Sequence, residues 1–313
     1  MTRVIFMGTP EFACSILQTL LEERYNVVAV VTQPDKKVGR AQTIVYSPVK
    51  QLALDNNIPV IQPISIKQEY QEVLDYQPDL IVTCAYGQIV PEIILNTPKY
   101  GCVNVHASLL PRLRGGAPIH KSIMYGEKET GVTLMYMAKR MDAGDMLAKR
   151  ATPIVEDDTV GSLHDRLMGL GSELVKEELP RLLNGELVGI PQNESEATFA
   201  YNVSKEEEFV DFTKSQQEIY DHIRSLIPWP VSYGIIKGKK MKFWGVSKGE
   251  IKSDSVVSGT VVSFEEKGMK VKAGEGYVYI SAMQMEGKSK MSAKDFYNGF
   301  GKQLVGEVFA TSM

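Results

Sequence analysis

The sequence has few of the residues that build disulfide frameworks or metal centres. Only three cysteines and four histidines occur among 313 residues. Cys14, Cys84 and Cys102 each lie in an apolar run and show no Cys-x-x-Cys spacing. We therefore expect them to be reduced core residues of a cytoplasmic protein rather than disulfide partners. Because the sequence contains no His/Cys cluster, it predicts no metal cofactor.

Long apolar runs and a strong net charge are also lacking. No apolar run approaches the ~18 residues of a membrane span, and a strand pattern already begins at Arg3, so we expect neither a span nor a targeting peptide. The net charge is −3, which excludes a global field that draws the protein to nucleic acid. The 43% of hydrophobic and 23% of charged residues are ordinary for a globular chain. At ~150 residues per domain, the length suggests two domains.

The first half of the chain alternates strand and helix patterns. An apolar strand at Arg3–Gly8 is followed by a helix at Phe12–Leu21 and a second apolar strand at Val27–Thr32. This order predicts an α/β fold with a Rossmann-like, mostly parallel sheet. The turn after the first strand lacks the Gly-x-Gly-x-x-Gly spacing, which disfavours a dinucleotide oxidoreductase. Further strands are predicted at Pro59–Ile61, Leu80–Ala85, Val132–Met137 and Met146–Ile154, and further helices at Pro48–Asn56, Lys67–Asp75 and Thr159–Leu183.

The most informative stretch runs from Gly101 to His120. Cys102–Val105 has the pattern of a buried strand, and Asn104 and His106 are two residues apart, so both side chains leave the same face. Open α/β sheets place ligands at the carboxyl ends of their strands. An Asn-x-His pair on its own is about as often structural, with both side chains hydrogen-bonded inside the protein, as it is catalytic. The glycine loop that follows and the acidic turn at Met141–Asp145 favour an acyl-transfer site.

The residues of this stretch also resemble a known family. Asn104–Arg112, which reads NVHASLLPR, and Arg114–Ile119, which reads RGGAPI, are similar to the signature of methionyl-tRNA formyltransferases. Shorter parts of this signature occur throughout the enzymes that use 10-formyltetrahydrofolate. The resemblance continues from the first strand to the C-terminus. It implies transfer of a formyl group from 10-formyltetrahydrofolate to the amino group of methionyl-initiator-tRNA for translation initiation, in the cytoplasm, with no covalent enzyme intermediate and no obligate protein partner.

The resemblance also implies which residues form the active site. Asn104 would donate to the oxyanion, His106 would be held by Asp142, and Asp142 would receive the proton lost by the amine. A lone aspartate in an Asp-x-Gly turn is more often structural, and Asp145 is expected to have only such a turn role. The folate co-substrate would contact Ser108, Leu109, Leu110 and Pro111, and also the turn Tyr86, Gly87 and Gln88. From the sequence alone, that turn is equally consistent with an ordinary connection between strand and helix.

Two basic regions are candidates for tRNA binding. The segment after Gln33 is a basic loop that contains Lys36, Lys37 and Arg40. A solvated turn is the commoner interpretation of such residues, but the resemblance implies an inserted loop that touches the tRNA acceptor end. Beyond Arg40 the chain continues Ala41-Gln42-Thr43-Ile44, whereas family members often carry more lysines there.

The second basic region follows a segment, starting near residue 190, that is polar and poor in apolar periodicity. We predict a catalytic domain at residues 1–189, a polar linker at 190–208 and an OB-like β-barrel domain at 209–313. The barrel is predicted because a helix at Ser215–Leu226 precedes many short strands separated by glycine. From Ile235 to Met313 there are thirteen lysines against eight acidic residues. Lys237, Lys239, Lys240 and Lys242 alternate with Met241, Phe243 and Trp244. A lysine run is usually just a solvated face, but Lys237, Lys239 and Lys240 are candidates for phosphate contact. The strands are predicted at Gly234–Ile236, Lys240–Trp244, Gly259–Ser263, Met269–Lys272 and Tyr277–Met283.

Two other functions compete with this interpretation. One is a different 10-formyltetrahydrofolate enzyme, which formylates a sugar nucleotide or a purine precursor or hydrolyses the co-substrate. The other is a tRNA-binding protein without activity. The two basic regions disfavour a small-molecule substrate, and the presence of all three candidate catalytic residues disfavours the loss of activity.

Overall fold

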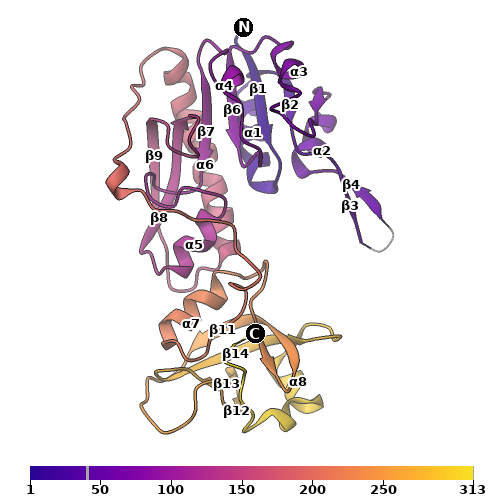
Figure 1. Cartoon of the computed structure of the whole chain (residues 1–313), viewed down its shortest axis with the longest axis vertical. Coiled ribbons are helices and arrows are strands. Elements are labelled where there is room, and N and C mark those ends of the chain that lie inside the picture. The colour runs from indigo at the N-terminus through magenta and orange to yellow at the C-terminus, as the bar shows by residue number, and fades with distance from the viewer. Residues whose placement is uncertain (40–41, 313) are drawn as a thin grey trace. The chain divides into compact units, whose positions relative to one another are not determined.

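The fold is described from a computed structural model, which places residues 1–39 and 42–312 (Figure 1). The predicted tRNA contact at Arg40 lies outside the described residues. The chain separates into two compact units. Unit 1 comprises Met1–Pro118, Glu129–Pro153 and His164–Tyr201. Unit 2 comprises Ile119–Lys128, Ile154–Leu163 and Asn202–Met313.

Unit 1 is built on a sheet with the strand order β5-β2-β1-β6-β7-β8-β9. The first five strands of this order are parallel, and β8 and β9 continue the sheet as antiparallel neighbours. Every residue of β6 is buried, which explains why all of them but Thr83 are apolar. The predicted mostly parallel α/β sheet is therefore confirmed. The strands are β1 (Arg3–Gly8), β2 (Asn26–Val31), β5 (Val60–Ile61), β6 (Leu80–Cys84), β7 (Cys102–His106), β8 (Glu129–Tyr136) and β9 (Met146–Pro153).

The four helices predicted between residues 12 and 183 fall close to their predicted positions. The first helix, α1 (Glu11–Glu22), buries one apolar stripe that contains Ile16 and Leu20. It packs against the long helix α6 (Val160–Leu183), where the Ser172 hydroxyl donates to the Ser15 carbonyl at 3.3 Å. The other two are α2 (Pro48–Asp55) and α3 (Tyr70–Leu74), and the structure adds the short helices α4 (Glu92–Leu95) and α5 (Pro118–Met124).

The segment predicted as a basic loop after Gln33 contains regular structure. Lys36–Val38 forms β3, Thr43–Val45 forms β4, and the two pair as an antiparallel hairpin. Strands of three residues are too short to show a readable alternation of apolar and polar positions, which explains why the sequence pattern indicated only a loop. The side chains of Lys36 and Lys37 are exposed.

Unit 2 contains a curled antiparallel sheet, a half-barrel, with the strand order β10-β11-β14-β13-β12 and with β15 paired to β14. This sheet is the counterpart of the predicted OB-like barrel. Its core includes Phe212, Phe243 and Phe309, whose ring centroids lie 4.9 to 5.8 Å apart. The strands are β10 (Tyr233–Ile236), β11 (Lys239–Lys248), β12 (Val261–Glu265), β13 (Gly268–Lys272), β14 (Tyr277–Met285) and β15 (Met291–Ser292).

Short helices complete the molecule. The helix α7 (Gln216–Arg224) begins with a capping box between Ser215 and Glu218. The helix α8 (Ala293–Gly299) begins at an N-cap formed by Ser292, and the sequence analysis did not predict it. Two 3₁₀ helices lie at Glu194–Glu196 and Gly301–Leu304. Within residues 1–39 and 42–312, none of the helices has the length and apolar character needed to cross a bilayer.

Candidate active site

Strand β7 carries the first two candidate catalytic residues, Asn104 and His106. Its register places Asn104 beside Thr83 of β6, whose hydroxyl donates to the Asn104 Oδ1 at 2.8 Å. An amide group has its acceptor and its donors at opposite ends. Engaging the oxygen in this way therefore directs the Asn104 NH2 group away from Thr83, as an orientated donor.

The second residue, His106, is 6% exposed and lies between two acceptors. Its Nε2 lies 3.0 Å from the Leu113 carbonyl oxygen, and its Nδ1 lies 3.7 Å from the Asp142 Oδ2. Because a carbonyl oxygen can only accept, Nε2 must carry a hydrogen. A neutral ring then presents the Nδ1 lone pair to the carboxylate, whereas a proton on Nδ1 would lie between the two groups. The arrangement can therefore hold and pass on a proton.

The third residue, Asp142, reaches this point from the turn between β8 and β9. Its Oδ2 accepts a hydrogen bond of 2.8 Å from the Gly115 backbone N–H, so the same carboxylate oxygen faces both the loop and the imidazole. The turn is tight, since a Cβ on Gly144 would lie 1.8 Å from the Tyr136 carbonyl oxygen. At the end of the turn, the backbone carbonyl of Asp145 accepts from the Tyr136 N–H at 2.9 Å. Two segments far apart in sequence thus bring His106 and Asp142 together.

The loop after β7 is held by its own polar groups. The Ser108 hydroxyl donates to the Arg112 carbonyl at 2.7 Å, and the Thr133 hydroxyl donates to the Ser108 carbonyl at 2.7 Å. The Leu110 N–H donates to the Thr133 hydroxyl at 3.2 Å, while the Lys149 ammonium donates to the Leu110 carbonyl. Of the predicted folate contacts in this loop, Ser108, Leu110 and Pro111 are buried and Leu109 is half-buried. The Ser108 side chain therefore shapes the loop.

The turn after β6 contains the other predicted folate residues. Tyr86 is 4% exposed, and its hydroxyl has no hydrogen-bond partner among the described residues. Burial raises the pKa of this phenol, so it remains a donor. Gly87 has a φ of +93°, a conformation that favours glycine. The side chain of Gln88 is engaged elsewhere, since it accepts from the Ile66 N–H at 2.9 Å and donates to the Pro63 carbonyl at 3.1 Å.

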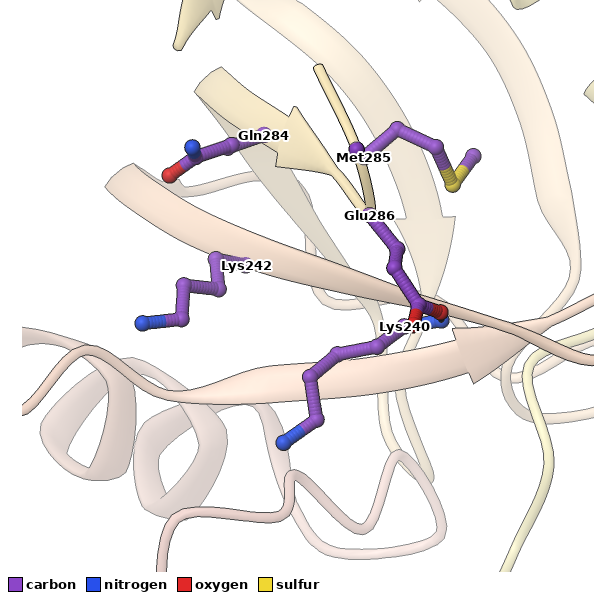
Figure 2. Close-up of a pocket in the computed structure, with 6 residues that line it drawn as sticks. Lys240, Lys242, Gln284, Met285 and Glu286 are labelled. Atoms are coloured by element: carbon purple, nitrogen blue, oxygen red, sulfur yellow. Dashed lines mark hydrogen bonds between the residues drawn. The ribbon is translucent and has the colours of Figure 1, made fainter. Parts of the chain in front are cut away.

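The predicted lysines of unit 2 lie around strands β10 and β11. Lys237 forms an ion pair of 2.8 Å with Glu307, Lys239 is exposed, and the Lys240 ammonium lies 3.4 Å from the centre of the Tyr233 ring. Figure 2 shows the side chains of Lys240 and Lys242 extending from β11 beside a pocket of about 250 Å³. The pocket is lined by Lys240, Lys242, Gln284, Met285, Glu286 and Gly287.

Two residues of these sites were missed by the sequence analysis. Thr83 orients Asn104 only because β6 and β7 pair in one register, which short apolar strands do not reveal. Gln192, which donates to the backbone of the Asp142 turn, lies in the segment predicted as a linker and carries no local signal.

Comparisons with known proteins give the family of the chain. A family profile described as "Formyl transferase" matches residues 2–179, and one described as "Formyl transferase, C-terminal domain" matches residues 202–301. The chain is 50% identical to the methionyl-tRNA formyltransferase of Geobacillus thermodenitrificans, over 97% of this chain and 96% of that protein.

Solved structures with a similar fold are more distant in sequence. HypX from Aquifex aeolicus in complex with tetrahydrofolic acid has a TM-score of 0.66 and 19% identity, over 98% of this chain and 48% of that chain. An N-formyltransferase from Helicobacter canadensis in complex with folinic acid and dTDP-3-aminofucose has a TM-score of 0.63 and 19% identity, over 93% of this chain and 100% of that chain. At this identity the likeness concerns the fold alone. With both profiles and the near-full-length relative taken together, the chain belongs to the formyl transferase family, among the methionyl-tRNA formyltransferases.

Proposed function

We propose that this protein transfers the formyl group of 10-formyltetrahydrofolate to the amino group of methionyl-initiator-tRNA, for translation initiation. The observation that carries the proposal is the convergence of His106 and Asp142, whose Nδ1 and Oδ2 atoms lie 3.7 Å apart although they come from separate segments. Asn104 leaves the same face of β7 as His106. These three groups are the donor, the proton carrier and the base that amide-bond formation requires.

The oxyanion is the first charge that the site must stabilise. The folate co-substrate supplies the formyl group, and attack by the methionyl amine places negative charge on the formyl oxygen. The Asn104 NH2 group donates to this oxygen, because Thr83 already holds the carbonyl end of the amide. Losing one such donor typically costs about 10² to 10³ in rate. The positive charge of a protonated His106 ring stabilises the negative charge on the same oxygen electrostatically.

Proton transfer completes the reaction. A bond forms between the amine nitrogen and the formyl carbon, and the bond from that carbon to the folate N10 breaks. Asp142 receives the proton that the amine loses, directly or through a water molecule, and His106 relays a proton to the leaving N10. General acid–base steps of this kind contribute about 10² to 10⁴ in rate. No side chain forms a covalent bond to the formyl group.

The folate would bind beside the turn after β6. The buried Tyr86 hydroxyl has no partner among the described residues, so it can donate a hydrogen bond to a nitrogen or oxygen atom of the pterin. Gly87 allows a ligand to approach the backbone, and the half-buried Leu109 supplies apolar contact, while the buried Leu110 and Pro111 would help to shape the loop. Ser108 and Gln88 act mainly through the backbone, since their side chains hold the local structure.

Binding of the tRNA would use basic residues of both units. In unit 1, Lys36 and Lys37 are exposed on the β3–β4 hairpin, next to the segment that contains Arg40. In unit 2, the sites are Lys237 and Lys239, and Lys240 together with Lys242 beside Gln284 (Figure 2). Among the described residues, no carboxylate forms an ion pair with Lys239 or Lys242, so their charges are available to phosphates.

The test is transfer of a labelled formyl group from 10-formyltetrahydrofolate by the purified protein. Charged initiator tRNA should be formylated, whereas free methionine, a sugar nucleotide and charged elongator tRNA should not. Activity with the purified chain would also support the proposal that it needs no obligate protein partner. Faster transfer to the sugar nucleotide would overturn the proposal in favour of a small-molecule formyltransferase. Fractionation of cells tests the proposed cytoplasmic location.

A further inference from the structure

The segment predicted as the start of the linker runs alongside the turn that carries Asp142. Ile190 and Met146 exchange two backbone hydrogen bonds of 2.9 Å and form an antiparallel bridge at the start of β9. Two residues further on, the side chain of Gln192 reaches into the turn and is only 9% exposed. Residues 190–194 therefore belong to the structure around the candidate site.

The amide nitrogen of Gln192 spans the turn. Its Nε2 donates to the backbone carbonyl of Asp142 and to that of Gly144, each at 2.8 Å. Asp142 has a φ of +50°, which is uncommon for a residue with a side chain and costs free energy unless its surroundings hold it. Two hydrogen bonds to one amide are a direct means of holding that conformation.

The other end of the amide is held by a buried arginine. The Nε and Nη2 atoms of Arg114, a residue only 1% exposed, donate to the Gln192 Oε1 at 3.0 and 2.7 Å. A guanidinium can only donate, so the amide oxygen must face it and the NH2 group must face the two carbonyls. Glu194 secures the guanidinium with two more hydrogen bonds, of 2.9 and 3.2 Å. The pKa of Glu194 is lowered to about 2 by Arg114 and Arg140, so the pair stays charged at neutral pH.

The two ends of Asp142 are thus held by connected groups. Its backbone carbonyl is held by Gln192, and its carboxylate by the N–H of Gly115, which directly follows Arg114. We propose that Gln192 is a positioning residue, which with Arg114 holds Asp142 at the place where it meets His106. This inference rests on the proposed function, in which Asp142 accepts the proton of the amine.

Replacing Gln192 by glutamate distinguishes a role in positioning Asp142 from a role in stabilising the fold. Gln192→Glu keeps an acceptor for Arg114 and almost the same volume, but removes both donors and sets a carboxylate oxygen against two carbonyl oxygens. The Asp142 turn should then relax. Because displacing a reacting group by about 1 Å costs on the order of 10²-fold, we expect kcat to fall about 100-fold. The KM values for folate and for charged tRNA should change less than threefold.

The matched control is Gln68→Glu, which makes the same chemical change at an exposed position. Both variants are assayed with the full chain, well below their unfolding temperatures, and kcat/KM is measured against pH. For Gln192→Glu we expect the acidic limb of the profile to shift, since the surroundings of the Asp142 carboxylate change. A role in stability alone would lower the unfolding temperature and leave kcat and the profile of the folded protein unchanged.

A second variant keeps the test decisive if Gln192→Glu does not fold. Gln192→Met is similar in length and uncharged, removes the same donors, and should also lower kcat with little change in KM. Wild-type kcat and pH profile in either folded variant, alongside strong loss in Asp142→Asn, would overturn the positioning role and leave the proposed function intact. Full activity in Asp142→Asn itself would instead overturn the role of Asp142 as the base, whereas only failure of the wild-type chain to formylate charged initiator tRNA would overturn the proposed function.

Discussion

The sharpest prediction concerns the charge of Asp142. In Asp142→Asn, an amide oxygen replaces the carboxylate oxygen that accepts from the Gly115 N–H at 2.8 Å, so the loop can keep its hydrogen bond. The negative charge 3.7 Å from the His106 Nδ1 is lost. The variant therefore changes the electrostatics and the proton acceptor of the site while leaving its shape nearly intact.

The size of the effect follows from the geometry. When the ring of His106 is protonated, as in the proposed mechanism, two unit charges 3.7 Å apart interact by about 4 kcal/mol at an effective dielectric constant of about 20. That value suits this pair because the two side chains are only 7% and 17% exposed. An energy of about 4 kcal/mol corresponds to about 10³ in rate, which lies within the range that general base catalysis supplies. We expect kcat to fall about 10³-fold.

The assay is formyl transfer to charged initiator tRNA at saturating folate, with single-turnover measurements to isolate the chemical step. Asp55→Asn, an exposed aspartate on α2 that accepts from Gln51, is the matched control and should keep wild-type turnover. The KM for tRNA should stay within a few-fold in both variants. A folded Asp142→Asn protein whose kcat lies within tenfold of wild type would refute the assignment of Asp142 as the base.

Three further predictions concern stability and reactivity. Burial lowers the pKa of His222 in the folded protein below 6.5. As the pH falls below 6.5, the unfolded chain therefore binds a proton at His222 more readily than the folded protein, and the contribution of this residue to stability is lost. In urea titrations, the free energy of unfolding should fall by up to about 1.4 kcal/mol more in the wild type than in His222→Gln between pH 7.5 and 5.5. If the free energy of unfolding changed equally with pH in the two proteins, this explanation would be wrong. Burial raises the pKa of Cys102 to about 12 and that of Cys14 to about 11, so both thiols stay protonated. Iodoacetamide at pH 8 should therefore label the folded protein far more slowly than the unfolded one, and equal rates would exclude this explanation. Phe243→Ala should lower the free energy of unfolding of unit 2 by about 3 to 5 kcal/mol, because the side chain is fully buried between two other phenylalanines. A loss below about 1 kcal/mol in denaturant titration would show that the core closes over the gap.

Local patterns predicted the elements that form the framework of unit 1. The runs at 4–7 and 80–82 are apolar because both faces of the parallel sheet are covered, and that continuity is visible in the sequence. The alternation of Lys240 and Lys242 with Met241 and Phe243 is also visible in the sequence, and in β11 the two apolar side chains are buried while the two lysines are half-buried. These predictions succeeded because each depends on neighbours within a few residues.

The short and the distant features were not predictable in this way. The β3–β4 hairpin has strands of three residues, which are too short for a periodic signal. The helix α8 begins at the N-cap Ser292, in a stretch with weak apolar periodicity. The segment at 190–201 is polar enough to resemble a linker, yet Gln192 and Glu194 use that polarity to hold a buried arginine.

The candidate site also combines features that local sequence predicts with contacts between distant residues. The sequence by itself determined that Asn104 and His106 share one face of a strand and that an acidic turn lies nearby in the fold, because both follow from backbone periodicity and motif. Only the tertiary structure decided that Thr83 orients the amide, that Leu113 and Asp142 flank the imidazole, and that Gln192 joins Arg114 to the Asp142 turn. Those contacts join residues 7 to 78 positions apart, and their geometry depends on strand register and on side chains that no local pattern encodes.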